Sequence, residues 1–179
     1  MDALENIRER RSVRKYSEKK VSTEIICEIV QDAAYAPSWM NFQSVGYIAI
    51  LNPEMKNKVA GCMAVEYNMR NVRSAPAVVI LISQDHVSGF MADHSELAPH
   101  RAEHWQSFDA GIAAQTFCLA AHARGLGTLI MGIWDEEGLR RVVGIPEDCR
   151  IAAVIAVGYA EGVQEVPRRK SLDELLSFR

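Results

Sequence analysis

Basic side chains gather in the segment RERRSVR, residues 8–14, and their spacing suits them to bind a phosphate group. Arg10, Ser12 and Arg14 alternate just past a predicted helix end, and alternate residues of an extended chain point to the same side. Guanidinium groups bind phosphate oxygens in a bidentate manner. Residues 168–170, RRK, form a second basic cluster near the other end of the chain. The two clusters either meet around one phosphomonoester or remain solvent-facing charges.

Residues 36–43, APSWMNFQ, form a polar but uncharged segment between an amphipathic helix and an apolar strand. Ser38, Asn41 and Gln43 carry no charge, and none of them is a good nucleophile unaided. Asparagine and glutamine each offer a donor and an acceptor, which suits them to the edge of a flat polar ligand. The segment indicates a binding role, and the alternative is a turn that only ends the preceding helix.

A third candidate site lies in the sequence HSELAPHRAEHW, where His100, Glu103 and His104 match the H-x-x-E-H motif. Two histidines one helical turn apart could share a zinc ion while the glutamate acts as a base, as in a small metallopeptidase. The match rests on three fixed positions only. A looser metal site that includes His94 and a solvated polar helix are the alternatives.

Composition and charge exclude several other classes of protein. The sequence contains no G-x-G-x-x-G after a strand, no Walker A motif and no G-x-S-x-G elbow. A net charge of -3 gives no support to nucleic-acid binding, and no apolar run is long enough to span a membrane. The charged N-terminus is unlike a signal peptide. The 4 cysteines form no C-x-x-C pair, which predicts reduced thiols in a cytoplasmic protein.

Elements predicted from periodicity would position these residues within one domain of 179 residues. The predicted helices cover residues 2–10, the stretch from the cap Ser22 to Ala36, and residues 53–63, 107–124 and 135–143, with a last one near Ser171. The predicted strands cover residues 45–51, 77–83, 128–131 and 151–157. The alanine-rich face of 107–124 indicates close packing against the sheet or a partner subunit. Without regular β-α-β spacing, the order predicts an α+β fold, and segment 84–106 stays unassigned.

The fragments RRSVRKY, APSWMNFQ, DAGIAAQTFCLAAHARGLGT, GIPED with VGY, and PRRKSLDEL occur in one order and spacing. Together they resemble the nitroreductase family of FMN-dependent oxidoreductases. The resemblance implies an α+β fold with a central mixed or antiparallel sheet flanked by helices. It implies a homodimer with FMN in the interface. It also implies ping-pong hydride transfer from NADH or NADPH to nitroaromatics, quinones or related acceptors, with the flavin rather than a catalytic side chain carrying the reaction.

The resemblance assigns roles to particular positions of this sequence. It implies that the phosphate is held by Arg10, Arg11, Ser12, Arg14, Arg168 and Arg169. It implies that the ring and ribityl chain are contacted by Ser38, Asn41, Gln43, Asn68, Met131 and Gly132. Two positions depart from the family pattern: Asn71 stands where a lysine is common, and Ser44 with Val45 replace a common proline–aromatic pair. Arg70 or Arg73 could take the place of that lysine; otherwise the flavin potential is lower.

Segment 84–106 is where the resemblance is weakest. Besides a metal site or a solvated polar helix, the segment could form a lid over the flavin. In that lid, the substrate pocket would be shaped by His100, His104, Trp105 and Phe108. Trp39 either packs in the dimer interface or stands over the substrate side of the ring. A flavin-binding protein with a sensing, storage or flavin-modifying role is the alternative function.

Overall fold

The computed structural model describes residues 2–99 and 102–179 and is built around one antiparallel sheet. Within that range the strands are β1 (Val45–Ile50), β2 (Ala77–Gln84), β3 (Gly127–Met131) and β4 (Cys149–Gly158). Their order in the sheet is β1-β2-β4-β3, and each neighbouring pair is antiparallel. The two edge strands β1 and β3 are therefore three strand spacings apart, or about 14 Å.

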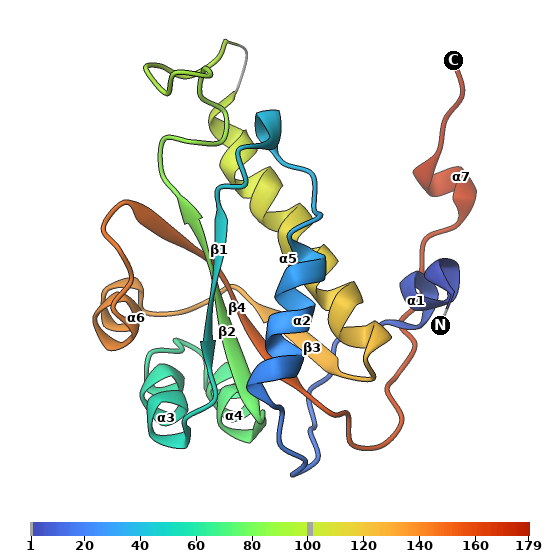
Figure 1. The fold of residues 1–179 in the computed structure, drawn as a ribbon. Coiled ribbons are helices and arrows are strands. Elements are labelled where there is room, and N and C mark those ends of the chain that lie inside the picture. Colours follow the sequence, from blue (N-terminus) through green and yellow to red (C-terminus); the bar gives the residue numbers. More distant parts are fainter. Residues whose placement is uncertain (1, 100–101) are drawn as a thin grey trace.

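Helices cover both faces of this sheet (Figure 1). α2 (Thr23–Ala33) and α5 (Trp105–Ala123) lie on one face. The other face carries α3 (Pro53–Gly61), α4 (Glu66–Ser74) and α6 (Glu136–Val143). The remaining helical pieces are α1 (Ala3–Glu9), α7 (Leu172–Leu175) and the 3-10 turns η1 (Trp39–Asn41) and η2 (Ala102–His104). No helix of the described residues is both long and apolar enough to cross a membrane.

Strand alternation divides the core into two halves. In β2, Val78 and Ile80 belong to the half under α3, α4 and α6, whereas Val79 and Leu81 belong to the half under α2 and α5. A strand buried on both faces needs apolar side chains on both, which explains the continuous run AVVILIS. The pairing of β2 with β4 shifts register between Leu81 and Ile82, at a bulge in the sheet.

The alanine-rich face of α5 packs against the sheet and α2. Ala110, Ala114 and Ala121 are buried there together with Phe117, which is fully enclosed. The Phe117 ring stacks on Tyr47 of β1 at a centroid distance of 5.5 Å. Small side chains let the long helix approach the strands closely, so this face is part of the chain's own core.

The α+β expectation is confirmed, and the sheet is the antiparallel form of the two forms expected. Most predicted elements are present with ends that differ by a few residues. α4 was not predicted, because the sequence EYNMRNVRS is mostly polar and anchors itself in the core chiefly through Met69 and Val72. Of segment 84–106, Gln84 ends β2, the described residues 85–99 form turns and short loops, and residues 102–106 belong to η2 and the start of α5.

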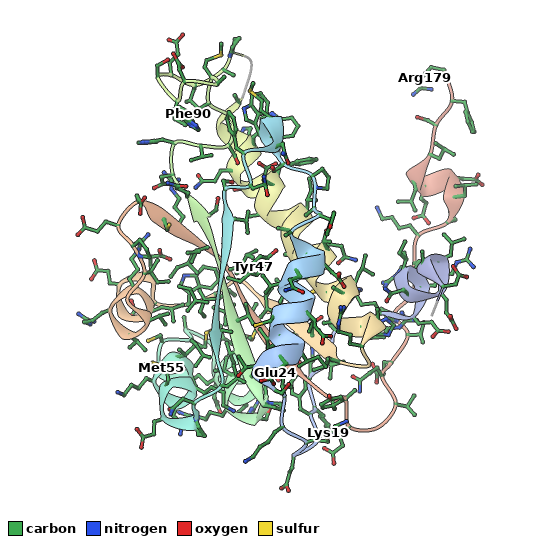
Figure 2. All side chains as sticks on the ribbon, in the orientation of Figure 1. Lys19, Glu24, Tyr47, Met55, Phe90 and Arg179 are labelled. Carbon is green, nitrogen blue, oxygen red and sulfur yellow. The ribbon has the colours of Figure 1, made fainter. Side chains whose placement is uncertain are left out.

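The C-terminal arm, residues 159–179, leaves the body of the molecule after β4. Its start is held by a bridge between Tyr16 and Ala160 and by the hydrogen bond from Glu161 N to Lys15 O. α7 and the last residues then extend away from the sheet to Arg179 (Figures 1 and 2). Apolar side chains of the arm stay exposed, notably Leu172 and Leu175 at 68% each and Phe178 at 85%.

Candidate functional site

The N-terminal basic segment lies along the edge strand β3. Ser12 forms a parallel bridge with Thr128, and Val13 N donates to Thr128 O at 2.9 Å. Val13 is buried while Ser12 and Arg14 on either side of it are exposed, so the predicted alternation is present. Arg10 Nε is buried and has no hydrogen-bond partner among the described residues. Arg10, Ser12 and Arg14 thus form one basic strip beside the start of β3.

Arg11 and His122 lie at the junction of α1 and α5, beside this strip. Arg11 Nη1 donates to Arg10 O at 2.9 Å, so its head group turns back toward the end of α1. Asn6 donates to Leu119 O at 3.1 Å, and its amide oxygen lies 2.6 Å from His122 Nδ1. Burial, helped by the charge of Arg10, lowers the pKa of His122. These contacts fix α1 on the C-terminal end of α5.

The far end of β3 meets the start of α4. Met63 bridges to Trp134, and Ala64 N donates to Ile133 O at 3.4 Å, which places the first turn of α4 beside the chain that leaves β3. That turn carries Asn68, which is half-buried. Among the described residues, no atom beyond the two chain neighbours lies within 4 Å of a Cβ built on Gly132, which is exposed, whereas Met131 is 4% exposed. The space beside the Gly132 backbone is therefore open to a flat ligand.

Asn71 does not present a charge or a free side chain in place of the lysine. It is 4% exposed, and its Nδ2 finds no partner among the described residues. Arg70 lies on the surface, 3.5 Å from Glu66 one turn earlier. Arg73 is also exposed.

The loop that contains the predicted ring contacts is held in an uncommon backbone conformation. Met40, Asn41 and Gln43 have φ values of 47°, 59° and 53°, in the left-handed region that non-glycine residues rarely occupy. Ser38 Oγ accepts the backbone N–H of Gln43 at 3.0 Å, and Gln43 Nε2 donates to Asn41 O at 3.3 Å. Such conformations persist only where neighbouring contacts enforce them, and they cluster at binding sites.

Aromatic rings surround this loop. Trp39 and Trp105 have centroids 4.9 Å apart, and the Trp105 ring lies 5.0 Å from that of Phe108. Trp39 Nε1 donates to Phe90 O at 2.8 Å, so the turns after β2 fold against the loop; Figure 2 labels Phe90 there. Of the residues predicted to shape a substrate pocket, the structure brings Trp39, Trp105 and Phe108 together.

His104 ends η2, close in sequence to Trp105, and His100 lies outside the described residues. The H-x-x-E-H motif is therefore only partly described. In the rest of the chain that the structure describes, no group of three or more histidine, cysteine, aspartate or glutamate side chains is placed to hold a metal ion.

A buried carboxylate near the loop was missed in the sequence. Asp109 of α5 is 1% exposed and accepts hydrogen bonds from Trp39 N and Ser88 Oγ. With Ser38 and Gln43 it lines a cavity of about 340 Å³ between α2, β1 and α5. The available signal was an aspartate at the head of an otherwise small and apolar helix face, in DAGIAAQ.

The predicted site residues fall into two groups that one chain keeps apart. The β3 group contains Arg10, Ser12, Arg14, Asn68, Met131 and Gly132. The β1 group contains Ser38, Trp39, Asn41, Gln43, Trp105 and Phe108. These groups lie at opposite edges of the sheet, about 14 Å apart in strand spacings alone. Arg168 and Arg169 lie in the exposed arm, which begins beside the β3 group. Val166 of this arm and Arg11 line the same cavity.

Comparison with known proteins decides the family. The nitroreductase family model matches residues 7–159. The chain belongs to the nitroreductase family. A Methanothermobacter thermautotrophicus protein provisionally named NADH dehydrogenase/NAD(P)H nitroreductase is 32% identical over 166 residues, which cover 89% of this chain and 78% of that protein.

Solved structures of nitroreductases share this fold. A nitroreductase family protein from Streptococcus pneumoniae TIGR4 superposes with a TM-score of 0.88 at 20% identity, over 99% of this chain and 100% of the other. A provisionally named nitroreductase from Exiguobacterium sibiricum, solved in complex with FMN, gives a TM-score of 0.87 at 20% identity, over 100% and 98%. At these identities the likeness establishes the fold alone. Both groups of predicted residues fall within the nitroreductase match, whereas Arg168 and Arg169 follow it.

Proposed function

We propose that this nitroreductase is an FMN-dependent oxidoreductase that uses NADH or NADPH to reduce nitroaromatics, quinones or related acceptors. The chain forms a single domain, and two copies share each FMN between them. The observation that carries the proposal is the division of the predicted site. The β3 group offers cations and open backbone, and the β1 group offers amides and aromatic rings. Two chains would bring both groups to one flavin.

The β3 group fits the phosphate and one edge of the ring. Arg10, Ser12 and Arg14 would hold the phosphate with Arg169, and an anion would give the buried Arg10 Nε an acceptor. Gly132 has no side chain, so a flat ring can lie against the backbone after β3. Asn68 would donate to the ring at the pyrimidine side, where negative charge is stabilised by nearby donors. When bound, FMN supplies the electron chemistry, and the protein supplies binding and orientation.

The β1 group of the second copy would complete the site. Ser38, Asn41 and Gln43 supply neutral donors and acceptors along the ring and ribityl chain. The left-handed backbone of Asn41 and Gln43 holds their amides in place before the ligand arrives, which lowers the entropy lost on binding.

Exposed apolar side chains support a second copy as the covering partner. α1 buries none of its residues, and Leu4 and Ile7 are 57% and 56% exposed. Leu172, Leu175 and Phe178 of the arm are exposed as well. Apolar side chains clustered on a terminal helix and an extended arm are typical of an interface between copies.

The aromatic side chains around Trp39 support a planar acceptor. Trp39, Trp105 and Phe108 present ring faces and edges, and Phe108 is 58% exposed. Offset stacking against such rings favours aromatic and quinone ligands over aliphatic ones. We place the protein in the cytoplasm, because Cys27, Cys62, Cys118 and Cys149 are all free thiols.

The absorption spectrum of the purified protein tests the cofactor. A yellow protein that releases FMN on denaturation supports the proposal, and a colourless protein that takes up no added FMN overturns it. Oxidation of NADH or NADPH with a nitroaromatic or quinone acceptor then tests the reaction. FMN-loaded protein without turnover would indicate the sensing, storage or flavin-modifying class instead.

Two sets of variants test the site. Arg10→Ala combined with Arg169→Ala should weaken FMN binding by about tenfold or more, because each arginine contributes a charge-assisted hydrogen bond. Arg141→Ala on α6 is the matched control, since it removes an exposed arginine elsewhere. Unchanged affinity of the double variant would exclude these arginines from the site.

Co-expression tests whether the site is shared. One chain would carry Arg10→Ala with Arg14→Ala and the other Asn41→Ala with Gln43→Ala, with different affinity tags. In a mixed dimer with shared sites, one site carries all four changes and the other carries none, so FMN binding and turnover return. If each site lay within one chain, the mixed dimer would remain as inactive as its parents.

A further inference from the structure

One carboxylate oxygen of Asp109 anchors the loop 39–44, which carries the predicted ring contacts Asn41 and Gln43, at both of its ends. Asp109 Oδ2 accepts the backbone N–H of Trp39 at 2.9 Å and the hydroxyl of Ser88 at 2.6 Å. Asp109 Oδ1 is buried and has no partner among the described residues. Burying a carboxylate with one oxygen unsatisfied costs free energy, so packing alone gives no reason for an aspartate here.

The direction of the next hydrogen bond follows from the proton count. A serine hydroxyl has one proton, and that of Ser88 is donated to Asp109. In the 2.7 Å contact between Ser44 Oγ and Ser88 Oγ, Ser44 is therefore the donor. Through Ser88, Asp109 holds Ser44 as well as Trp39. These two residues bracket the loop 39–44.

The loop between these anchors needs such support. Met40, Asn41 and Gln43 occupy the left-handed region, where a non-glycine residue costs about 1 kcal/mol. Trp39 also donates its indole N–H to Phe90 O at 2.8 Å, and Ser88 lies in the same run of turns as Phe90. Asp109 thus ties the loop to the turns after β2, and it does so from the first part of the rigid helix α5.

We propose that Asp109 is a positioning residue for the aromatic cluster of Trp39, Trp105 and Phe108. Through Trp39 it determines which electron acceptors the protein prefers. This inference rests on the proposed function. Asp109 would act through its hydrogen bond to the Trp39 backbone, which helps to set the angle at which the indole meets Trp105. The coupling to Ser88 keeps the turns 85–90 and the loop 39–44 in one arrangement.

Three variants separate positioning from mere stability. Asp109→Asn retains an oxygen that can accept from both Trp39 N and Ser88 Oγ, so it should stay close to wild type. Asp109→Ala removes that acceptor and should raise KM for a bulky aromatic acceptor about tenfold, with a smaller change in kcat. Ser88→Ala keeps the Trp39 bond and should raise the same KM by roughly threefold. It remains informative if Asp109→Ala does not fold.

A second measurement does not depend on turnover. Acrylamide quenching of tryptophan fluorescence in the FMN-free protein should increase in Asp109→Ala, because the Trp39 backbone loses its hydrogen bond to Asp109. The increase should be absent in Asp109→Asn, and absent when Trp39→Phe is combined with Asp109→Ala. That comparison isolates Trp39 from Trp105 and Trp134.

The outcomes distinguish the two proposals. Unchanged quenching in Asp109→Ala overturns the positioning role. Increased quenching with an unchanged KM, or an equal loss in Asp109→Asn and Asp109→Ala, also overturns it, since only a structural or a charge effect would remain. A wild-type protein that neither binds FMN nor turns over refutes the proposed function, and quenching alone then decides whether Asp109 holds Trp39.

Discussion

Gly127→Ala should loosen the N-terminal basic strip from β3 through a single steric contact. A Cβ at residue 127 would lie 2.2 Å from Val13 Cγ2 and 2.7 Å from Val13 Cβ. Carbon atoms in van der Waals contact normally lie about 3.5 Å or more apart, so Val13 must move away by roughly 1 Å. Val13 is 3% exposed and belongs to the core half under α3, α4 and α6. We expect the backbone of residues 12–14 to move with it.

The magnitude follows from two terms. Overpacking of a tight core contact costs about 1–3 kcal/mol. The retreat also weakens the hydrogen bond from Val13 N to Thr128 O, now 2.9 Å long, which is worth about 1 kcal/mol. The free energy of unfolding should fall by roughly 2–4 kcal/mol. FMN affinity should fall about tenfold or more, because Ser12 and Arg14 lie on either side of Val13.

Urea denaturation of the FMN-free protein measures the first effect, and FMN fluorescence titration measures the second. Gly61→Ala is the matched control, since a Cβ at that position would meet no atom within 4 Å among the described residues outside its own helix backbone and chain neighbours. Adding Val13→Ala to Gly127→Ala makes room for the new methyl group. The double variant should be more stable than the sum of the single changes predicts, by about 1–3 kcal/mol. Strict additivity, or a Gly127→Ala protein as stable as wild type, would refute this reasoning.

Three further predictions concern the core, a helix end and pH. Phe117→Ala should lower the free energy of unfolding by about 3–5 kcal/mol in urea denaturation, because the ring is fully buried between α5 and the sheet. Gly144→Ala should cost about 1 kcal/mol in the same assay, because Gly144 ends α6 at φ 72°. Beyond its chain neighbours, no described residue lies within 4 Å of its Cβ position, so backbone strain acts alone. The lowered pKa of His122 means that the unfolded chain takes up its proton first as pH falls below about 6.5. Stability should therefore be lost as pH falls through about 6.5. Less of it should be lost in His122→Asn, whose amide can replace the Nδ1–H donor to Asn6, and equal pH dependence in both proteins would contradict the assignment.

Local patterns in the sequence determined most of the elements. Helix periodicity, caps such as Ser22 and continuous apolar runs act over a few residues, so they can be interpreted without knowledge of the fold. The same holds for the predicted placement of Arg10, Ser12 and Arg14 on one side of an extended segment; Ser12 and Arg14 are exposed, and Val13 between them is buried. Together with the order of the motifs, these patterns were enough to indicate the family.

Only the tertiary structure decided which of these residues meet. Strand order placed the β3 group and the β1 group at opposite edges, and no local pattern encodes the order β1-β2-β4-β3. Asp109 contacts Trp39 across 70 positions of sequence and Ser88 across 21. Such contacts depend on how distant elements pack. The entropic cost of closing a loop rises only slowly with its length, so sequence separation does not indicate which residues meet. The sequence therefore determined what each segment is suited to bind, and the packing of α5 against the sheet decided which segments one chain can bring to the same ligand.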